Sequence, residues 1–315
     1  MKKIKIGIST CLLGEPVRYD GQHKLDSFLR DTLGEYVDYV RSCPEVEVGL
    51  STPREAMHLA GDPESPRLVT VKTNEDLTAR MTAWSEKRVR ELESENLCGY
   101  IFKSKSPSCG MERVKVYSGK GMAVKTGVGI FATAYMAHFP LHPVEEEGRL
   151  HDPGLRENFI ERIFTFQRWR DRLAEGRKLG SLVTFHAQHK YLLHAHSETH
   201  ARQMGKIVAG ATELPLTERF AQYETLLLKA MALKATRSKH VNVLQHMLGY
   251  FKKDLTADEK QEVLEILEQY AAGTLPLIVP ITLINHYVRK YAKSYLADQF
   301  YLHPHPIELQ LRNHG

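Results

Sequence analysis

The chain has 315 residues, of which 42% are hydrophobic and 26% are charged, as is typical of a soluble globular protein long enough for two domains. No apolar stretch reaches the length of a membrane span, which argues against a membrane protein. The net charge is +5, and residues 151–315 carry the whole excess, with 22 Lys/Arg against 17 Asp/Glu. This half has either an anionic partner or a modestly basic solvated face.

Residues 1–150 alternate between strand-like and helical patterns. Runs of apolar and β-branched residues predict strands at 3–9, 36–42, 68–72 and 99–104, and helical periodicity predicts helices at 27–33, 77–97 and 131–139. This alternation predicts an α/β fold with a mainly parallel sheet flanked by helices. The acidic run at 145–148 is expected to form a surface turn.

Residues beyond 150 show helical periodicity only. A bridging helix is predicted at 153–172, followed by helices at 182–209, 216–233, 240–253, 257–272 and 278–296. Thr256 and Glu259 fit a capping box at the start of one of them. We therefore expect an α/β catalytic domain at 1–165 and an all-α helical-bundle domain at 166–315, with an RNA-binding or accessory role.

Cysteines follow three of the predicted strands. Cys11 follows the strand at 3–9, Cys43 follows the strand at 36–42, and Cys109 follows the strand at 99–104 and its serine-rich loop. Sites in open α/β sheets form at the carboxyl ends of the strands, so we expect these three thiols to converge. Cys98 precedes its strand and has no place in this set.

The role expected of the cysteines depends on the redox state of the compartment in which the protein is found. The first residues run directly into a strand and show no signal peptide, so we expect a cytoplasmic protein without a membrane partner. Four cysteines in such a chain favour metal binding or catalysis over disulfides.

Three interpretations of the three-cysteine set remain open. The thiols are small buried apolar groups, or three ligands of a zinc ion that also binds water, or three ligands of an iron–sulfur cluster. The absence of a C-x-x-C pair weighs against structural zinc. A cluster held by three thiolates fits best, and it leaves one iron open as a Lewis acid.

Polar residues beside the cysteines are candidates for proton transfer. Glu45 lies two residues after Cys43, behind the stiff Pro44, and is a candidate general acid or base; the alternative is a surface loop charge. Of the serines before Cys109, we select Ser106 to face the substrate, although such residues are also ordinary turn formers.

Three motifs in this order resemble the thiouracil desulfidase family: STCLLG at 9–14, CPE at 43–45 and KSPSCG at 105–110. The segments TFHAQHKYLL at 184–193 and TRSKHVNVLQH at 236–246 resemble a helical domain often fused to it. The combination looks like bacterial desulfidases that act on 4-thiouridine in tRNA. The resemblance implies a [4Fe-4S] cluster on Cys11, Cys43 and Cys109, with catalytic roles for Glu45 and Ser106.

The implied reaction is hydrolytic cleavage of a C–S bond. Water activated by Glu45 replaces the thiocarbonyl sulfur of a thiolated uracil with oxygen, and no net electron transfer is involved, so neither a nicotinamide nor a flavin cofactor is needed. The expected substrate is 4-thiouridine in tRNA, which becomes uridine. Alternatives are free thiouracil or a thiolated nucleotide, and a non-catalytic RNA-binding iron–sulfur sensor.

An enzyme that acts on tRNA must bind its phosphates and must extrude the target base from the folded RNA. The candidate contacts in the basic half are Arg168, Arg170, Lys190, Arg237, Lys239, Lys252 and Lys253. The alternative for any one of them is an ordinary solvated charge. We expect the histidines at 186, 189, 196 and 200 to lie on a polar face or to contact RNA rather than to bind a second metal ion.

Overall fold

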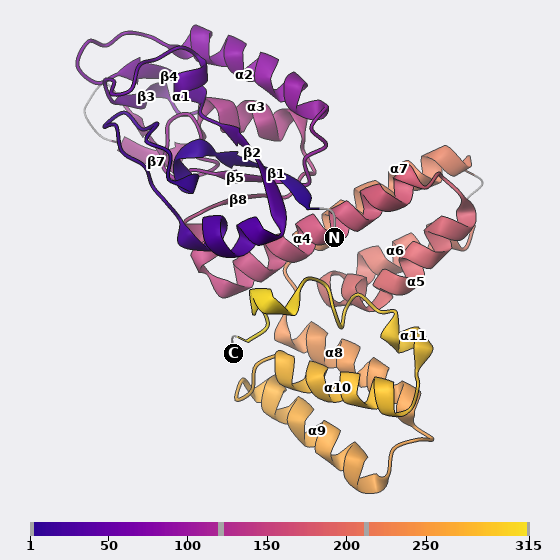
Figure 1. The fold of residues 1–315 in the computed structure, drawn as a ribbon. Helices are drawn as coiled ribbons and strands as arrows, with labels where there is room; N and C mark the ends of the chain where they lie inside the picture. Colours follow the sequence, from indigo (N-terminus) through magenta and orange to yellow (C-terminus); the bar gives the residue numbers. More distant parts are fainter. Residues whose placement is uncertain (1–2, 119–122, 211–213, 314–315) are drawn as a thin grey trace. The chain divides into compact units, whose positions relative to one another are not determined.

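The computed structural model describes residues 3–118, 123–210 and 214–313, and it divides into two compact units (Figure 1). Unit 1 is Met1–Asp152 and unit 2 is Pro153–Gly315. The division falls before helix α4, Pro153–Ala174, and thus earlier than the predicted boundary at 165/166. The reason is packing: Trp169 of α4 stacks on Phe220 and Tyr223, which belong to unit 2.

The first sheet of unit 1 has four strands in the order β2-β1-β5-β8, and every neighbouring pair is parallel. The strands are β1 (Ile4–Ser9), β2 (Val37–Ser42), β5 (Tyr100–Phe102) and β8 (Val144–Glu146). The predicted α/β fold with a parallel sheet is confirmed. The alignment of Ser9 with Ser42 brings β1 and β2 to an end at the same level.

The expectation of a surface turn at 145–148 holds for residues 147–148 only, because residues 145 and 146 belong to β8, an edge strand of this sheet. Glu145 and Glu146 are buried. Arg149 Nε donates to Glu145 Oε1 at 2.5 Å, and the Met111 amide donates to Glu146 Oε1 at 2.8 Å. Such partners offset the free-energy cost of burying the two carboxylates. The local composition does not reveal these partners, because tertiary contacts supply them.

A second sheet, in the order β4-β3-β6-β7, was only partly predicted. Its strands are β3 (Met57–Asp62), β4 (Ser65–Thr70), β6 (Val114–Tyr117) and β7 (Ala123–Gly127), and β3 pairs parallel with β6 while the outer pairs are antiparallel. Strands β3, β6 and β7 escaped prediction because at least half of the residues in each are exposed or only partly buried, which weakens the apolar pattern.

The helices of unit 1 support the sheets. They are α1 (Pro44–Glu47), α2 (Thr78–Glu93) and α3 (Ile130–His138), while a π-helical turn, Phe28–Thr32, and a 3-10 turn, Leu33–Glu35, stand where a helix at 27–33 was predicted. Tyr100 and Phe102 of β5 pack against Phe131 and Tyr135 of α3, so the strand that leads to Cys109 rests on a rigid aromatic core.

Unit 2 is helical, as predicted. Its further helices are α5 (Leu179–His196), α6 (Glu198–Val208), α7 (Leu216–Ala232), α8 (Arg237–Leu248), α9 (Ala257–Ala272), α10 (Ile278–Lys290) and α11 (Ser294–Ala297). The predicted helix at 182–209 is in fact two helices, because Ser197 adopts an extended conformation and caps α6. The predicted helix at 278–296 likewise divides into α10 and α11. The capping box of Thr256 and Glu259 is confirmed.

In the described part of the chain, no helix combines the length and apolarity that crossing a membrane requires.

A buried charge network stabilises unit 2. Arg312 is 4% exposed, and its guanidinium donates to Glu161 Oε1 at 2.7 Å and to Glu157 Oε1 at 3.1 Å. Glu161 Oε2 is also hydrogen-bonded to His196 Nε2 at 2.9 Å. Burial and the neighbouring Glu161 raise the pKa of Glu157 to about 8, whereas Arg312 and His196 lower the pKa of Glu161.

Replacing Arg312 with alanine should therefore lower the free energy of unfolding of unit 2 by about 3–5 kcal/mol, because it leaves carboxylates buried without a cation. The chain has two tryptophans, so the fluorescence of Trp169 in a Trp84→Phe background reports on unit 2 during urea denaturation. Arg202→Ala is the control, since its ion pair with Glu198 is exposed and is expected to contribute less than about 1 kcal/mol. Equal effects of the two substitutions would contradict the assigned role of Arg312.

Candidate active site

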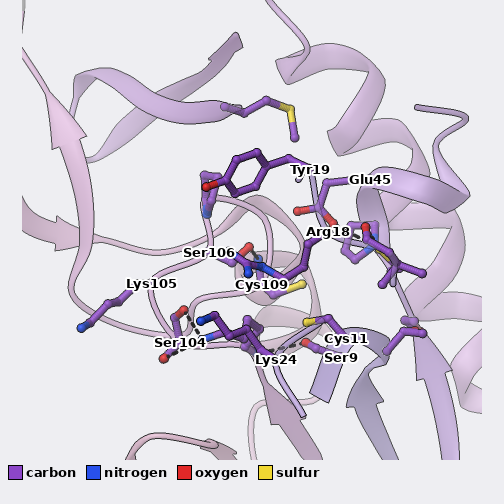
Figure 2. Close-up of a pocket in the computed structure, with 18 of the residues that line it drawn as sticks. Ser9, Cys11, Arg18, Tyr19, Lys24, Glu45, Ser104, Lys105, Ser106 and Cys109 are labelled. Carbon is purple, nitrogen blue, oxygen red and sulfur yellow. Dashed lines mark hydrogen bonds between the residues drawn. The ribbon is translucent and has the colours of Figure 1, made fainter. Parts of the chain in front are cut away.

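The parallel sheet brings the three cysteines together. Cys11 follows β1, Cys43 follows β2 and Cys109 lies in the loop after β5, and these three strands are neighbours in the sheet. All three thiols line one cavity of about 400 Å³ at the carboxyl ends of the strands. None of the four cysteines, all of them within the described residues, forms a disulfide. Figure 2 shows this cavity, with the side chains of Cys11, Cys109 and Glu45 around it.

Local structure orients the first two thiols. Cys11 lies in the 3-10 turn Thr10–Leu13, which ends at Gly14 with φ of +94°, a conformation that favours glycine. Cys43 is the N-cap residue of α1, where its amide donates to Glu47 Oε1 at 2.8 Å. Pro44 begins this short helix and suits its first turn.

The loop that carries Cys109 is clamped by α3. The amide of Phe131 donates to the carbonyl of Ser108 at 2.9 Å, and the amide of Gly129 donates to the carbonyl of Gly110 at 2.7 Å. Helix α3 approaches so closely at Gly129 that a Cβ atom there would lie 2.5 Å from the Ser108 carbonyl and 2.8 Å from the Cys109 nitrogen. A glycine at this position is therefore required for the observed placement of Cys109.

We expect Gly129→Ala to displace the Cys109 loop and to destabilise unit 1 by about 1–3 kcal/mol, as overpacking generally does. Titration with Cd²⁺, followed by thiolate absorbance, should show weaker binding than in the wild type. Gly180→Ala is the matched control, because a Cβ there would meet nothing within 4 Å. Wild-type Cd²⁺ affinity in Gly129→Ala would show that this contact does not position the thiol.

Cys98 lies at the other end of the sheet. Its amide donates to the carbonyl of Lys5 at 2.8 Å, just before β5 begins, and it does not line the cavity. A residue before a strand and a residue after it lie at opposite ends of that strand. Cys98 is therefore separated from the other three thiols, which lie at the carboxyl ends of the strands.

Burial controls the charge of the thiols. It raises the pKa of Cys11 to about 11 and the pKa of Cys43 to about 12, and Glu45 contributes to both shifts. The pKa of Cys109 is also raised well above its ordinary value, again mainly by burial. The thiols are therefore neutral at pH 7 without a cation, and binding a metal centre would release their protons.

Glu45 is the carboxylate of the cavity. Its Oε2 lies 3.5 Å from the sulfur of Cys43, and its side chain is 12% exposed. The guanidinium of Arg54 approaches the same oxygen, at 3.9 Å from Nη2. Arg54 is itself held by a hydrogen bond from Nη1 to the carbonyl of Val17 at 2.9 Å. The carboxylate is thus fixed beside the thiols, rather than being a mobile loop charge.

The three serines before Cys109 have different surroundings. Ser104 Oγ donates to Glu147 Oε1 at 2.7 Å, so its proton is engaged. Ser108 is fully buried and is not part of the cavity wall. Ser106 lines the cavity, and its oxygen accepts from the amide of Cys109 at 3.0 Å, which leaves its proton available for a ligand.

The cavity has a basic wall that the sequence analysis did not identify. Arg18, Lys24, Arg54, Lys103 and Lys105 all line it, and Lys24 and Lys105 are exposed without an ion-pair partner among the described residues. The exposed ring of Tyr19 lines the same cavity. Arg18 and Lys24 lie in the loop after β1, and Lys103 and Lys105 lie in the loop after β5. These positions were the available signal, because such loops border any site at the carboxyl ends of the strands. Arg54 lies between α1 and β3, where the sequence carried no such signal.

The donor set fits a metal centre with soft ligands. Three thiols from separate loops, neutral when unbound and able to become thiolates, are the donors that iron–sulfur clusters and zinc use. The additional charged groups are a carboxylate and several cations, which are better suited to bind a substrate than to complete the coordination of a soft metal. The residues present therefore fit a cluster held by Cys11, Cys43 and Cys109.

The segment that forms this cavity is shared with known proteins. The family model described as 2-thiouracil desulfurase matches residues 6–147, which include every residue lining the cavity. The chain belongs to the 2-thiouracil desulfurase family. The solved structure of the [4Fe-4S]-dependent thiouracil desulfidase TudS is 34% identical, covers 48% of this chain and 95% of its own, and gives a TM-score of 0.39.

Two further relatives each match about half of the chain. YbgA of Escherichia coli (strain K12) is 29% identical over 160 residues, or 50% of this chain and 95% of its own. YbbK of Bacillus subtilis (strain 168) is 30% identical over 152 residues, or 46% and 97%. Residues 190–306 match a second family model, described as a protein of unknown function (DUF1722). The predicted fusion of a desulfidase domain to a C-terminal domain is confirmed.

In this member of the desulfurase family, two of the predicted RNA contacts have structural partners in unit 2. Each guanidinium nitrogen of Arg168 donates a hydrogen bond, to His189, Thr165 and Pro304, and burial lowers the pKa of this arginine to about 9. Lys239 donates to the carbonyl of His196 at 2.7 Å. Because these donors already have acceptors, we do not expect Arg168 or Lys239 to contact RNA.

The other predicted contacts are more accessible. Lys190, Arg237, Lys252 and Lys253 are exposed, and Arg170 is half-buried with its guanidinium over the ring of Phe166. These residues stay candidates for RNA contact.

The expectation that the histidines lie on a polar face is wrong for His189 and His196, which are both fully buried. His189 is stacked against Phe185 and Phe300, with ring centroids 3.9 and 4.5 Å away, and its pKa is lowered well below the usual range by burial. His196 is part of the charge network around Glu161. Helical periodicity does not distinguish these interior positions from surface positions.

Proposed function

We propose that the protein replaces the thiocarbonyl sulfur of a thiolated uracil with oxygen, that its substrate is 4-thiouridine in tRNA, and that a [4Fe-4S] cluster on Cys11, Cys43 and Cys109 is its cofactor. One observation carries this proposal. The three thiols, Glu45 and Ser106 line a single cavity with basic walls. The family membership supports the reaction class.

The residues of the cavity have different roles in the proposed reaction. When bound, the cluster supplies an iron with a free coordination position and an affinity for sulfur. Glu45 removes a proton from the water that attacks the thiocarbonyl carbon, and Arg54 keeps its carboxylate in place. Ser106 donates a hydrogen bond to the base. A C–O bond forms, the C–S bond breaks, and the sulfur leaves as hydrosulfide, so electrons balance without a redox partner.

The charges around the cavity favour a nucleotide within RNA over a free base. Free thiouracil is neutral and makes no use of exposed cations such as Lys24 and Lys105 at the cavity wall. A polynucleotide places phosphates on either side of the reacting base, where lysine and arginine attract them. The net positive charge of residues 151–315 points to the same partner.

The test is an anaerobic assay of the full-length protein, reconstituted with iron and sulfide, on bulk tRNA that contains 4-thiouridine. Nucleoside analysis should show loss of 4-thiouridine and a matching gain of uridine. The specificity constant for tRNA should fall steeply with added salt, whereas that for free 4-thiouracil should change little, because only the polyanion releases counterions on binding. Conversion of the free base alone, by protein that holds its cluster, would contradict the tRNA substrate.

A further inference from the structure

Three tyrosines from separate elements of unit 2 form a cluster at its surface. Tyr191 is in α5, Tyr250 is in the 3-10 turn after α8, and Tyr295 is in α11. The rings of Tyr250 and Tyr295 are stacked, with centroids 5.6 Å apart and an angle of 18° between their planes, and Tyr191 packs edge-on against Tyr250. Tyr191 is buried, whereas Tyr250 and Tyr295 are 40% and 36% exposed.

Contacts between the segments that carry the two exposed rings hold these segments together. An ion pair between Lys293 Nζ and Asp254 Oδ2, at 2.7 Å, joins the segment of Tyr295 to that of Tyr250. The side chain of Gln299 donates to the carbonyls of Ala187 and Tyr295, which connects α11 to α5. The stacked pair is therefore a preformed feature, and a ligand need not order it.

Three lysines are next to the clustered tyrosines in the chain. Lys252 and Lys253 directly follow Tyr250 and Phe251, and Lys190 directly precedes Tyr191. These three lysines are exposed, and no ion-pair partner is found for them within the described ranges. The nearby Asp254 is already paired with Lys293. We call Tyr250, Tyr295, Lys190, Lys252 and Lys253 the Tyr–Lys surface.

We propose that the Tyr–Lys surface binds unpaired nucleotides of RNA, with a base stacked on the tyrosine pair and the adjoining phosphates on the lysines. An exposed aromatic ring beside cations is the arrangement by which proteins bind single-stranded nucleic acid. In a duplex the faces of the bases are already stacked on one another, so the tyrosine rings favour binding to loops and single strands. This inference rests on the proposed function, and it specifies which part of a folded RNA unit 2 would recognise.

Fluorescence anisotropy can test the proposal with a labelled single-stranded RNA oligonucleotide and a labelled RNA duplex, both without thiouridine. The Tyr250→Ala/Tyr295→Ala protein should bind the single strand about tenfold more weakly or worse, and the duplex as the wild type does. The Tyr250→Phe/Tyr295→Phe protein, which keeps both rings, should retain its affinity. Leu233→Ala, at another exposed apolar residue, is the control. Unchanged single-strand affinity in the double alanine protein would overturn the proposal.

Lysine variants provide a second test of the proposal, which does not depend on the packing of the tyrosines. Lys252→Ala/Lys253→Ala should reduce the slope of log affinity against log salt by about 0.7 for each phosphate that a lysine no longer neutralises. An unchanged slope would also overturn the proposal. Tyrosine-dependent binding of the oligonucleotide without desulfidation of tRNA would support this surface and refute the proposed function, whereas desulfidation with tyrosine-independent binding would do the opposite.

Discussion

Substitution of Glu45 by glutamine is expected to lower the rate of desulfidation by a factor of about 10²–10⁴, the usual contribution of a general base. Glutamine keeps the size of the side chain but cannot accept a proton from water. The Cys43 sulfur, at 3.5 Å, and Arg54 Nη2, at 3.9 Å, both approach Oε2 of this carboxylate, which holds it at the cavity where it can take a proton from water. Single-turnover rates with thiolated substrate, at measured iron content, provide the test.

The control for this experiment is Glu15→Gln. Glu15 lies in the loop after Cys11 and pairs with Arg41, and it is not among the residues that line the cavity. Both variants should retain a full complement of iron. A Glu45→Gln protein with its cluster and a rate close to that of the wild type would remove Glu45 from the mechanism.

Loss of any one thiol of the cavity should abolish both the cluster and the activity. We expect Cys11→Ala, Cys43→Ala and Cys109→Ala proteins to reconstitute with little iron, because two thiolates and an open cavity do not complete the coordination of a cluster. Iron and acid-labile sulfide analysis of each variant, together with its visible absorbance, provides the measurement.

Cys98→Ala is the matched control, since it also removes a buried thiol from unit 1 but lies before β5, at the other edge of the sheet. It should bind iron and turn over substrate as the wild type does. Full iron content in Cys43→Ala, or loss of the cluster in Cys98→Ala, would refute the proposed ligand set.

Charged residues of unit 2 show where prediction from sequence reaches its limit. Arg168, Lys239 and His196 were assigned to an RNA face or a polar face by their type and spacing. The structure gives each of them partners within unit 2: Arg168 donates to a buried histidine, Lys239 donates to a helix end, and His196 is part of a buried charge network. Whether a charge is solvated or buried depends on what packs against its helix, and periodicity carries no information on that.

The parallel sheet and the convergence of three thiols were predictable from the amino-acid sequence. Both follow from local physics, because runs of β-branched residues separated by helices form parallel strands, and the residues after such strands meet at one edge. The rest of the cavity depends on contacts between distant segments, which the sequence pattern does not reveal. Gly129 constrains the Cys109 loop from a distant helix, Arg54 reaches Glu45 from another loop, and the basic wall is assembled from several segments. Such contacts join residues far apart in the chain, and their formation depends on the packing of the whole unit.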